Sequence, residues 1–342
     1  MKYSQNISIR KNNKELMFLL LCFIALISSI ILGICIGSVR IAVPEFFSAL
    51  ISDENTVNYR IITAVRIPRV LASVLAGSAL AVSGVIIQAV LENPLAAPSI
   101  IGVNSGAGFF AVLAMALFPH HSALVPAAAF LGAMVTVSVV YLIARKNGAS
   151  KITLVLAGIA VGNLLSAGIN TITTFYPDAL TGANAFRIGG VAGVTIGKLT
   201  PAWIYIVAGI LISVLLSHEL DILSLGDKTA RSLGMNVKFI RFLVLMTAAM
   251  LAGVAVSFSG LLSFVGLIVP HITRYFIKSG NLRLIIGAAM LGAAFVTICD
   301  LLSRVLFSPY EIQLGIVISY IGVPFFIYLI MKKRGGRHGD KV

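Results

Sequence analysis

The sequence predicts an all-α, polytopic membrane protein of about ten transmembrane helices, and three observations support this fold class. Hydrophobic residues make up 58% of the 342 residues and charged residues only 11%, whereas a soluble chain of this length carries a larger charged share. Long charge-free segments recur along the whole chain. Two segments of the chain also resemble one another, which indicates an internal repeat.

The charge-free segments define the predicted helices, because a bilayer core of about 30 Å needs about 20 apolar residues in helical form. The first segment is longer than the apolar part of a secretory signal, so we expect an uncleaved span. We predict one transmembrane domain over residues 1–342. Its expected spans are 16–38, 62–90, 94–118, 122–144, 152–176, 199–217, 239–260, 262–278, 283–305 and 312–331.

The second span, 62–90, is the predicted centre of the bundle. It begins with two arginines around a proline, Arg66 to Arg69, and ends before Asn93-Pro94. Between them lie small residues, which let neighbouring membrane helices approach closely. These small residues are Ala76, Gly77, Ala79, Ala81, Ser83 and Gly84.

This span also carries the evidence for a repeat. The segment LAGSALAVSG (75–84) aligns with LAGVAVSFSG (251–260), and the same offset of 176 residues places Pro94 on Pro270. The second and seventh spans are an odd number of crossings apart, so the two copies run in opposite directions. We therefore predict an inverted repeat that relates spans 2–5 to spans 7–10. Chance agreement among small residues is the alternative.

Lysine and arginine are distributed unevenly between the two predicted sides. With the N-terminus inside, the inner segments hold 19 of the 26 basic residues and the outer segments hold seven. Basic residues concentrate in cytoplasmic segments of membrane proteins, so we expect both termini in the cytoplasm. This bias also explains the net charge of +14, and we expect no nucleic acid among the partners.

The largest inner segment, 218–238, holds a candidate docking helix between two glycines. Leu225, Thr229 and Leu233 are spaced four residues apart, so they share one face of a helix that is suited to fill a groove of a cytoplasmic partner. The alternative is an ordinary basic inner loop. The candidate residues are Gly226, Asp227, Lys228, Thr229, Ala230, Arg231, Ser232, Leu233 and Gly234.

Three arginines, Arg66, Arg69 and Arg304, lie at the predicted outer ends of spans, where basic residues are scarce. If they face outward, their guanidinium groups are suited to bind carboxylates of another protein. In the alternative, Arg304 pairs with Asp300 one helical turn earlier, and the other two arginines reach lipid headgroups.

Asn93, Pro94, Asn104 and Pro270 are candidates for helix breaks or for a polar path. A proline within a span frees a carbonyl that only protein or a water-filled cavity can satisfy. Hydrogen bonding between helices is the alternative for the asparagines.

Catalytic and cofactor motifs are missing from the sequence. The Gly-Lys at 197–198 is followed by Leu199, so it is not a P-loop. We expect no catalytic residues, cofactor or metal site in this chain. The span centres hold almost no ionisable residue of the kind that a proton-coupled carrier uses. Energy for any uphill transport is therefore expected to come from outside this chain.

Six ordered segments together resemble the permease subunits of the ABC importers for iron-siderophores, haem and cobalamin, the FecCD type. The segments are RIPR (66–69), the small-residue run 75–84, ENPLAAPSIIGVNSGAG (92–108), GDKTARSLGMN (226–236), FVGLIVPHITR (264–274) and CDLLSR (299–304) with the GVPFFIYLI ending (322–330). The resemblance extends over essentially the whole chain.

The resemblance implies a permease that works as a pair, either homodimer or heterodimer, in the plasma or inner membrane. Its partners are expected to be two cytoplasmic ABC ATPase subunits and an extracytoplasmic solute-binding protein. It implies that Arg66, Arg69 and Arg304 meet acidic residues of the binding protein, and that 226–236 is the coupling helix on the ATPase. A ferric siderophore is the expected cargo. An ion-coupled secondary transporter is the alternative function, and a membrane enzyme ranks last.

Overall fold

A computed structural model describes residues 2–37, 57–146 and 150–335 of the chain. Within these residues every regular element is a helix, which confirms the all-α prediction. The elements are α1 (Lys2–Cys35), α3 (Val57–Arg60), the π-helix η1 (Ile61–Arg66), α4 (Ile67–Val90), the 3-10 helix η2 (Pro98–Ile101), α5 (Val103–Leu117), α6 (Leu124–Lys146), α7 (Lys151–Phe175), α8 (Ala179–Ile188), α9 (Ile196–Leu215), α10 (Ser217–Leu223), α11 (Asp227–Ser232), α12 (Val237–Ser259), α13 (Val265–Phe276), α14 (Asn281–Val305) and α15 (Leu314–Gly335).

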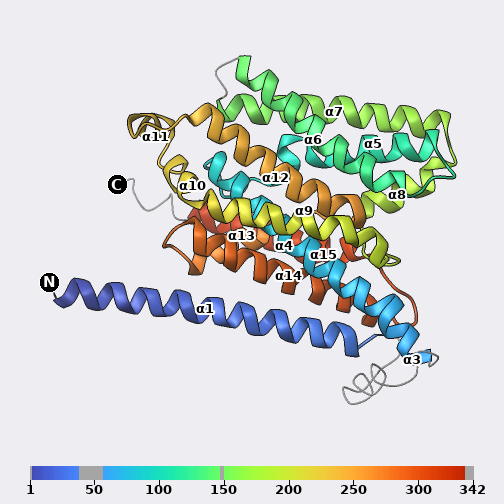
Figure 1. The fold of residues 1–342 in the computed structure, drawn as a ribbon, viewed down its shortest axis with the longest axis horizontal. Helices are drawn as coiled ribbons and strands as arrows, with labels where there is room; N and C mark the ends of the chain where they lie inside the picture. The colour runs from blue at the N-terminus through green and yellow to red at the C-terminus, as the bar shows by residue number, and fades with distance from the viewer. Residues whose placement is uncertain (1, 38–56, 147–149, 336–342) are drawn as a thin grey trace.

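The long helices form one bundle whose two ends carry different elements (Figure 1). One end holds α3 and the start of α4, and we call it the α3 end. The opposite end holds α10, α11 and the start of α1, and we call it the α11 end. The end of the first predicted span at Ser38 and the tail 336–342 lie outside the described residues. So does Arg40, which is one of the seven basic residues of the predicted outer segments.

The described part of the chain holds eight helices long and apolar enough to cross a membrane. The two other predicted spans are occupied by α5, with 15 residues, and by α13, with 12. At 1.5 Å per residue they are only about 22 and 18 Å long. The predicted bounds 94–118 and 262–278 are therefore too long.

Both short helices are preceded by a break with left-handed backbone. Gly102 (φ 86°) ends the η2 turn before α5, and Gly260 (φ 66°) and Phe264 (φ 64°) bound the connection before α13. The predicted break at Pro270 is wrong, because α13 continues through it. Pro270 lies one turn into α13, so its missing N–H frees only a first-turn carbonyl.

The packing supports the inverted repeat. The helix α4 packs against α14, and α12 packs against α6, so each first helix of a copy contacts the third helix of the other copy. The two first helices, α4 and α12, also pack against each other and run in opposite directions (Figure 1).

The predicted central position of the second span is confirmed by its burial. In its apolar part 83% of the residues are buried, against 22% for α1 and for α7. A Cβ atom at Gly77 would lie 2.2 Å from the carbonyl oxygen of Gly292 on α14, and one at Gly84 would lie 1.9 Å from that of Gly266 on α13. Only glycine allows these backbones to approach so closely.

The prediction missed α8, which lies between the fifth and sixth predicted spans in a segment that Asp178, Arg187 and Lys198 interrupt. Its buried residues Ala179, Ala183 and Phe186 are spaced four and three residues apart, which is the pattern of a helix with one buried face. The end of α8 is bonded to the α12–α13 connection and to α15. Phe186 O accepts from Leu261 N at 2.9 Å, and Gly189 O accepts from Gly315 N at 3.1 Å.

We predict that Gly84→Ala destabilises the protein, because the added methyl group must displace the backbone of α13. The expected cost is at least about 3 kcal/mol, the upper end of measured overpacking costs. A lower midpoint of thermal unfolding and a smaller yield of monodisperse protein would reveal it. The matched control is Gly197→Ala, since an added Cβ there has nothing within 4 Å. Equal stability of the two variants would contradict the prediction.

Candidate functional site

The three predicted outer arginines meet at the α3 end of the bundle. Arg66 ends η1, Arg69 lies in the first turn of α4, and Arg304 lies in the last turn of α14. They are 4%, 7% and 4% exposed, respectively. Of the two predicted arrangements, the one in which all three face outward is not found in this structure, because each guanidinium group is turned toward other parts of the chain.

Two of the arginines cap the end of α1. Arg66 Nη1 donates to the carbonyl oxygens of Ile34 at 2.6 Å and Cys35 at 3.1 Å. Arg304 donates through Nη2 to Gly33 O at 3.1 Å and through Nη1 to Ile36 O at 3.3 Å. The last carbonyls of a helix lack partners within it and carry the negative end of its dipole, so cations stabilise them.

The third arginine holds two carboxylates. Arg69 Nε donates to Asp300 Oδ1 at 2.9 Å, and its Nη1 donates to Glu311 Oε2 at 2.8 Å. Asp300 is fully buried, and its Oδ2 lies 3.3 Å from Arg304 Nε. The Arg304–Asp300 pair of the predicted alternative is therefore present, whereas Arg66 and Arg69 bond to other parts of the chain and not to lipid headgroups as that alternative predicted. We call Arg66, Arg69, Arg304, Asp300 and Glu311 the arginine cluster.

Sequence reasoning missed Glu311, which lies in the connection between α14 and α15. A signal was available, because Asp300 and Glu311 are the only acidic residues between Asp227 and Asp340. Because acidic residues are this scarce, Asp300 and Glu311 are the first candidates for partners of a buried arginine such as Arg69.

At the α11 end, the predicted docking helix forms α11 with a glycine on each side. Gly226 (φ 94°) and Gly234 (φ 83°) both have left-handed backbone, which glycine adopts without strain. Gly234 N donates to Arg231 O at 3.0 Å and Met235 N to Ala230 O at 3.1 Å. This pair of bonds is a Schellman motif, so the glycine ends α11 sharply.

An ion pair fixes α11 to α12. Arg241 Nη2, on a side chain that is 2% exposed, lies 2.5 Å from Asp227 Oδ1. Burial acts to raise the pKa of Asp227, but the hydrogen bond and charge of Arg241, with the charges of Lys151 and Arg231, lower it below its ordinary value. The pair therefore stabilises α11 at neutral pH, and this contribution is lost as the pH falls through the lowered pKa.

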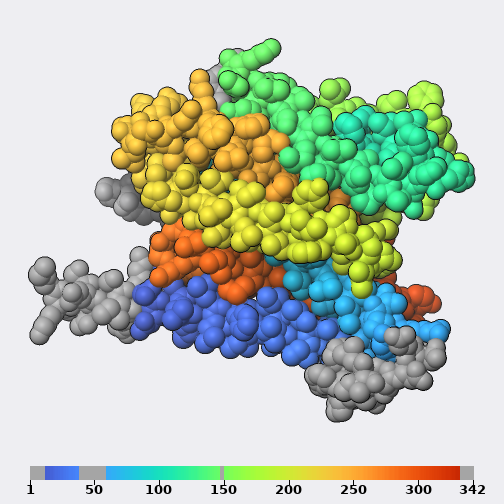
Figure 2. All heavy atoms as spheres, in the orientation of Figure 1, coloured from blue at the N-terminus to red at the C-terminus, as the bar shows by residue number. Residues whose placement is uncertain are grey.

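The helix α11 is shorter than the predicted apolar face requires, because it covers only Asp227–Ser232 and the two leucines flank it. Leu225 and Leu233 are 62% and 61% exposed, and Thr229 is exposed as well, whereas Ala230 is buried. In the space-filling view, the segment from α10 to the start of α12 projects at the α11 end (Figure 2). The two leucines are thus accessible to a partner.

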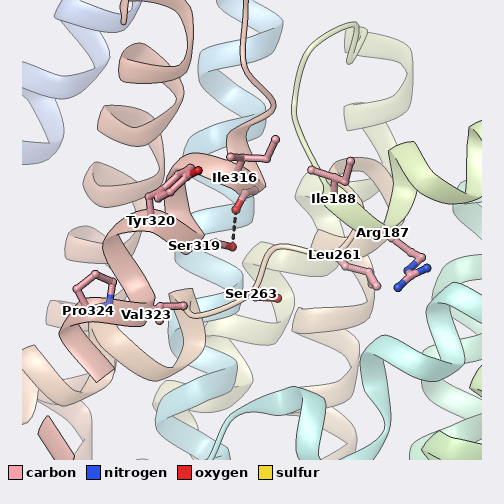
Figure 3. A pocket seen from close by; sticks show the side chains of 10 residues that line it. Arg187, Ile188, Leu261, Ser263, Ile316, Ser319, Tyr320, Val323 and Pro324 are labelled. Carbon is pink, nitrogen blue, oxygen red and sulfur yellow. Dashed lines mark hydrogen bonds between the residues drawn. The ribbon is translucent and has the colours of Figure 1, made fainter. Parts of the chain in front are cut away.

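Two cavities lie along α15, and a break between helices forms part of the wall of each. The break before α13 contributes Leu261 and Ser263 to the first cavity, and the turn after α4 contributes Pro94 and Leu95 to the second. The first, the α8 cavity, has a volume of about 590 Å³, and Figure 3 shows side chains of α15, α8 and the α12–α13 connection around it. It is lined by Arg187, Ile188, Leu261, Ser263, Gly315, Ile316, Ser319, Tyr320, Val323 and Pro324. The second, the α13 cavity, has a volume of about 540 Å³ and is lined by Pro94, Leu95, His271, Ile272, Tyr275, Phe276, Phe325, Tyr328 and Leu329.

The four predicted path residues have different positions. Pro94 lines the α13 cavity. Asn93 Oδ1 accepts from Leu95 N at 3.0 Å, so this side chain shapes the turn after α4. Asn104 is half-buried on α5 and Pro270 is buried in α13, and neither lines one of these two cavities.

Comparison with known proteins gives concordant matches. The model of the FecCD transport family matches residues 24–332. The chain is 34% identical to the Fe(3+)-citrate import system permease protein YfmE of Bacillus subtilis, over 94% of this chain and 96% of the relative. It is 35% identical to the achromobactin transport system permease protein CbrC of Dickeya dadantii, over 97% and 95%. A solved metal-chelate type ABC transporter in an inward-facing conformation superposes with a TM-score of 0.83, at 29% identity over 92% of this chain and 98% of that one.

We predict that Asp300→Asn destabilises the protein strongly, because it leaves Arg69 and Arg304 buried with one carboxylate fewer. Removing one partner of a buried ion pair costs about 3–5 kcal/mol. Thermal unfolding of the purified protein measures the loss. Asp178→Asn makes the same change of charge at an exposed residue and is expected to leave the midpoint unchanged. Similar midpoints for both variants would count against a structural role of the cluster.

Proposed function

Because the chain belongs to the FecCD transport family, we propose that it is the permease subunit of an ATP-driven importer for a ferric siderophore. The family consists of membrane permease components of ABC transporters, which are not enzymes. The observation that carries the proposal is the extent of the family match. It runs over residues 24–332 and therefore includes the arginine cluster, both cavities and α11.

The proposed cargo follows from the relatives. Two of them are named for ferric citrate and for achromobactin, and the similar structure is described as a metal-chelate type transporter. A ferric siderophore belongs to the same chemical class, an iron ion enclosed by an organic chelator. Haem and cobalamin are the other cargoes to be tested.

Membership of the family implies partner subunits. An ABC permease works with ATPase and binding-protein components, and we propose a second permease copy or a homologous subunit as well. The α11 end is proposed to face the cytoplasm of a cell whose plasma or inner membrane holds the protein. The excess of basic residues in the segments predicted to be inner supports this orientation.

The two cavities support a proposed path along α15. The α8 cavity is lined by the first half of α15, from Gly315 to Pro324, and the α13 cavity by Phe325 to Leu329. Irregular backbone at membrane depth is tolerated where it is covered by protein or lines a water-filled space. In each cavity the irregular backbone of a helix break forms part of the wall, which is a position where such backbone is tolerated.

The proposed mechanism uses α11 as the mechanical link to the ATPases. ATP binding draws the two ATPases together, and α11 moves with the ATPase that holds it. Since Asp227 and Arg241 join α11 to α12, the movement reaches the helix that packs against α4 and α6. The bundle then changes between two packed arrangements, whose populations depend on ATP and on the binding protein.

We predict that the double variant Leu225→Asp, Leu233→Asp loses the ATPase while the permease stays folded. Both leucines are exposed, so the change adds charge at the proposed contact without disturbing the core. Co-purification of the ATPase should fall at least tenfold, which corresponds to about 1.4 kcal/mol. Exposed Leu164 and Leu211, changed to Ala on α7 and α9, serve as the control. Unchanged co-purification of the ATPase would argue against α11 as the coupling helix.

We also predict that ATP hydrolysis alone supplies the energy. Uptake by the complete transporter in proteoliposomes should stop with vanadate, an inhibitor of ATP hydrolysis, and persist when ionophores collapse the ion gradients. The opposite pattern would identify an ion-coupled secondary transporter, which is the alternative function. Transport by this chain without ATPase subunits would also exclude the proposal.

A further inference from the structure

Glu311 differs from the other members of the arginine cluster in its exposure. Its side chain is 40% exposed, whereas those of Arg69 and Asp300 are 9% and 0% exposed. Asp300 is held by two arginines inside the bundle. Glu311 is therefore the carboxylate of this cluster that an external group can replace.

The position of Glu311 also decides how Arg69 can be reached. Nε of Arg69 is bonded to buried Asp300, and Nη1 is bonded to Glu311 on the solvent side. With only 9% of the Arg69 side chain exposed, an incoming carboxylate approaches the guanidinium group where Glu311 now lies. The exchange of one carboxylate for another leaves no buried cation unpaired, so it avoids the main cost of breaking such a pair.

The segment that carries Glu311 has few other ties to the bundle. Residues 305–311 are all exposed, with Phe307 at 59% and Tyr310 at 80%. Among the described contacts of 306–313, the ion pair with Arg69 is the one salt bridge. Ile312 N donates to Ser303 O at 3.1 Å, and the Ile312 side chain packs against the core. Loss of the ion pair would therefore loosen the segment more than it would loosen a packed loop.

This segment leads directly into α15 and the α8 cavity. Leu314 begins α15 three residues after Glu311, and Gly315 N donates to Gly189 O at 3.1 Å. A Cβ at Gly315 would lie 1.7 Å from Ile188 O, so the start of α15 is seated tightly on the end of α8. Gly315 and Ile188 both line the α8 cavity. The segment that Glu311 holds is therefore continuous in the chain with the wall of that cavity.

We propose that Glu311 occupies the position on Arg69 that a carboxylate of the extracytoplasmic binding protein takes on docking, so that docking displaces Glu311 and releases the segment 306–313 at the start of α15. This inference rests on the proposed function, because it needs a binding protein at the α3 end. It adds an internal competitor to that contact and a link from the contact to the α8 cavity.

The test measures the affinity of the cognate extracytoplasmic binding protein for the complete transporter in lipid nanodiscs. Glu311→Gln and Glu311→Ala remove the competing charge and should tighten binding about fivefold, since exposed ion pairs contribute up to about 1 kcal/mol. Arg69→Gln should weaken binding at least tenfold. The matched control, Asp178→Asn, removes an exposed negative charge outside the cluster and should bind as the wild type does.

Hydrogen exchange of the transporter without binding protein provides the second measurement. In Glu311→Ala the amides of 306–313 should exchange faster than in the wild type, and those of α4 and α14 should not change. This pattern would show that Glu311 holds the segment and that the fold is intact.

The outcomes separate the two claims. If Arg69→Gln binds as the wild type does, the proposed docking contact fails. If Arg69→Gln binds weakly but both Glu311 variants bind no more tightly than Asp178→Asn, only the competitor inference is overturned. Unchanged exchange of 306–313 in Glu311→Ala would also overturn it.

Discussion

The close contact of α4 with its neighbours is the constraint on which the rest of the structure depends. Lipid chains are as apolar as the helices, so burial of apolar surface does not drive helices together in a membrane, and close van der Waals packing must do so. Gly77 and Gly84 bring the backbone of α4 against those of α14 and α13. These contacts place Arg69 of α4 beside Asp300 of α14 and cover the short helix α13 from one side.

Much of the fold could be predicted from the sequence, because charge-free length is a direct consequence of the bilayer as a solvent. The same criterion fails where a segment is apolar but not helical. It could not distinguish the turns at Pro94 and Gly102 from helix, so α5 was predicted too long. It also missed α8, whose spacing of Ala179, Ala183 and Phe186 predicts a helix, because charged residues leave no long charge-free stretch there.

The two ends of the bundle differ in how far the sequence predicts them. The conformation of α11 follows from local features, since a glycine on each side of six helical residues sets both boundaries. The arginine cluster depends on partners that are distant in the chain, because Arg69 and Glu311 are 242 residues apart. The carbonyl acceptors of Arg66 belong to the end of α1, and no side-chain pattern in the sequence marks a backbone acceptor.

The polar contacts near the two ends of α1 indicate the thickness of the hydrocarbon core that surrounds the protein. Near the α11 end, Glu15 accepts from Lys278 N at 3.1 Å and from Arg283 Nη1 at 3.0 Å. Near the α3 end, the carbonyls of Gly33 and Ile34 accept from arginines. At 1.5 Å per residue these two ties are separated by about 27 Å along the helix axis. This distance matches a hydrocarbon core of about 30 Å, so the covalent length of one helix sets the width of bilayer that the whole protein fits.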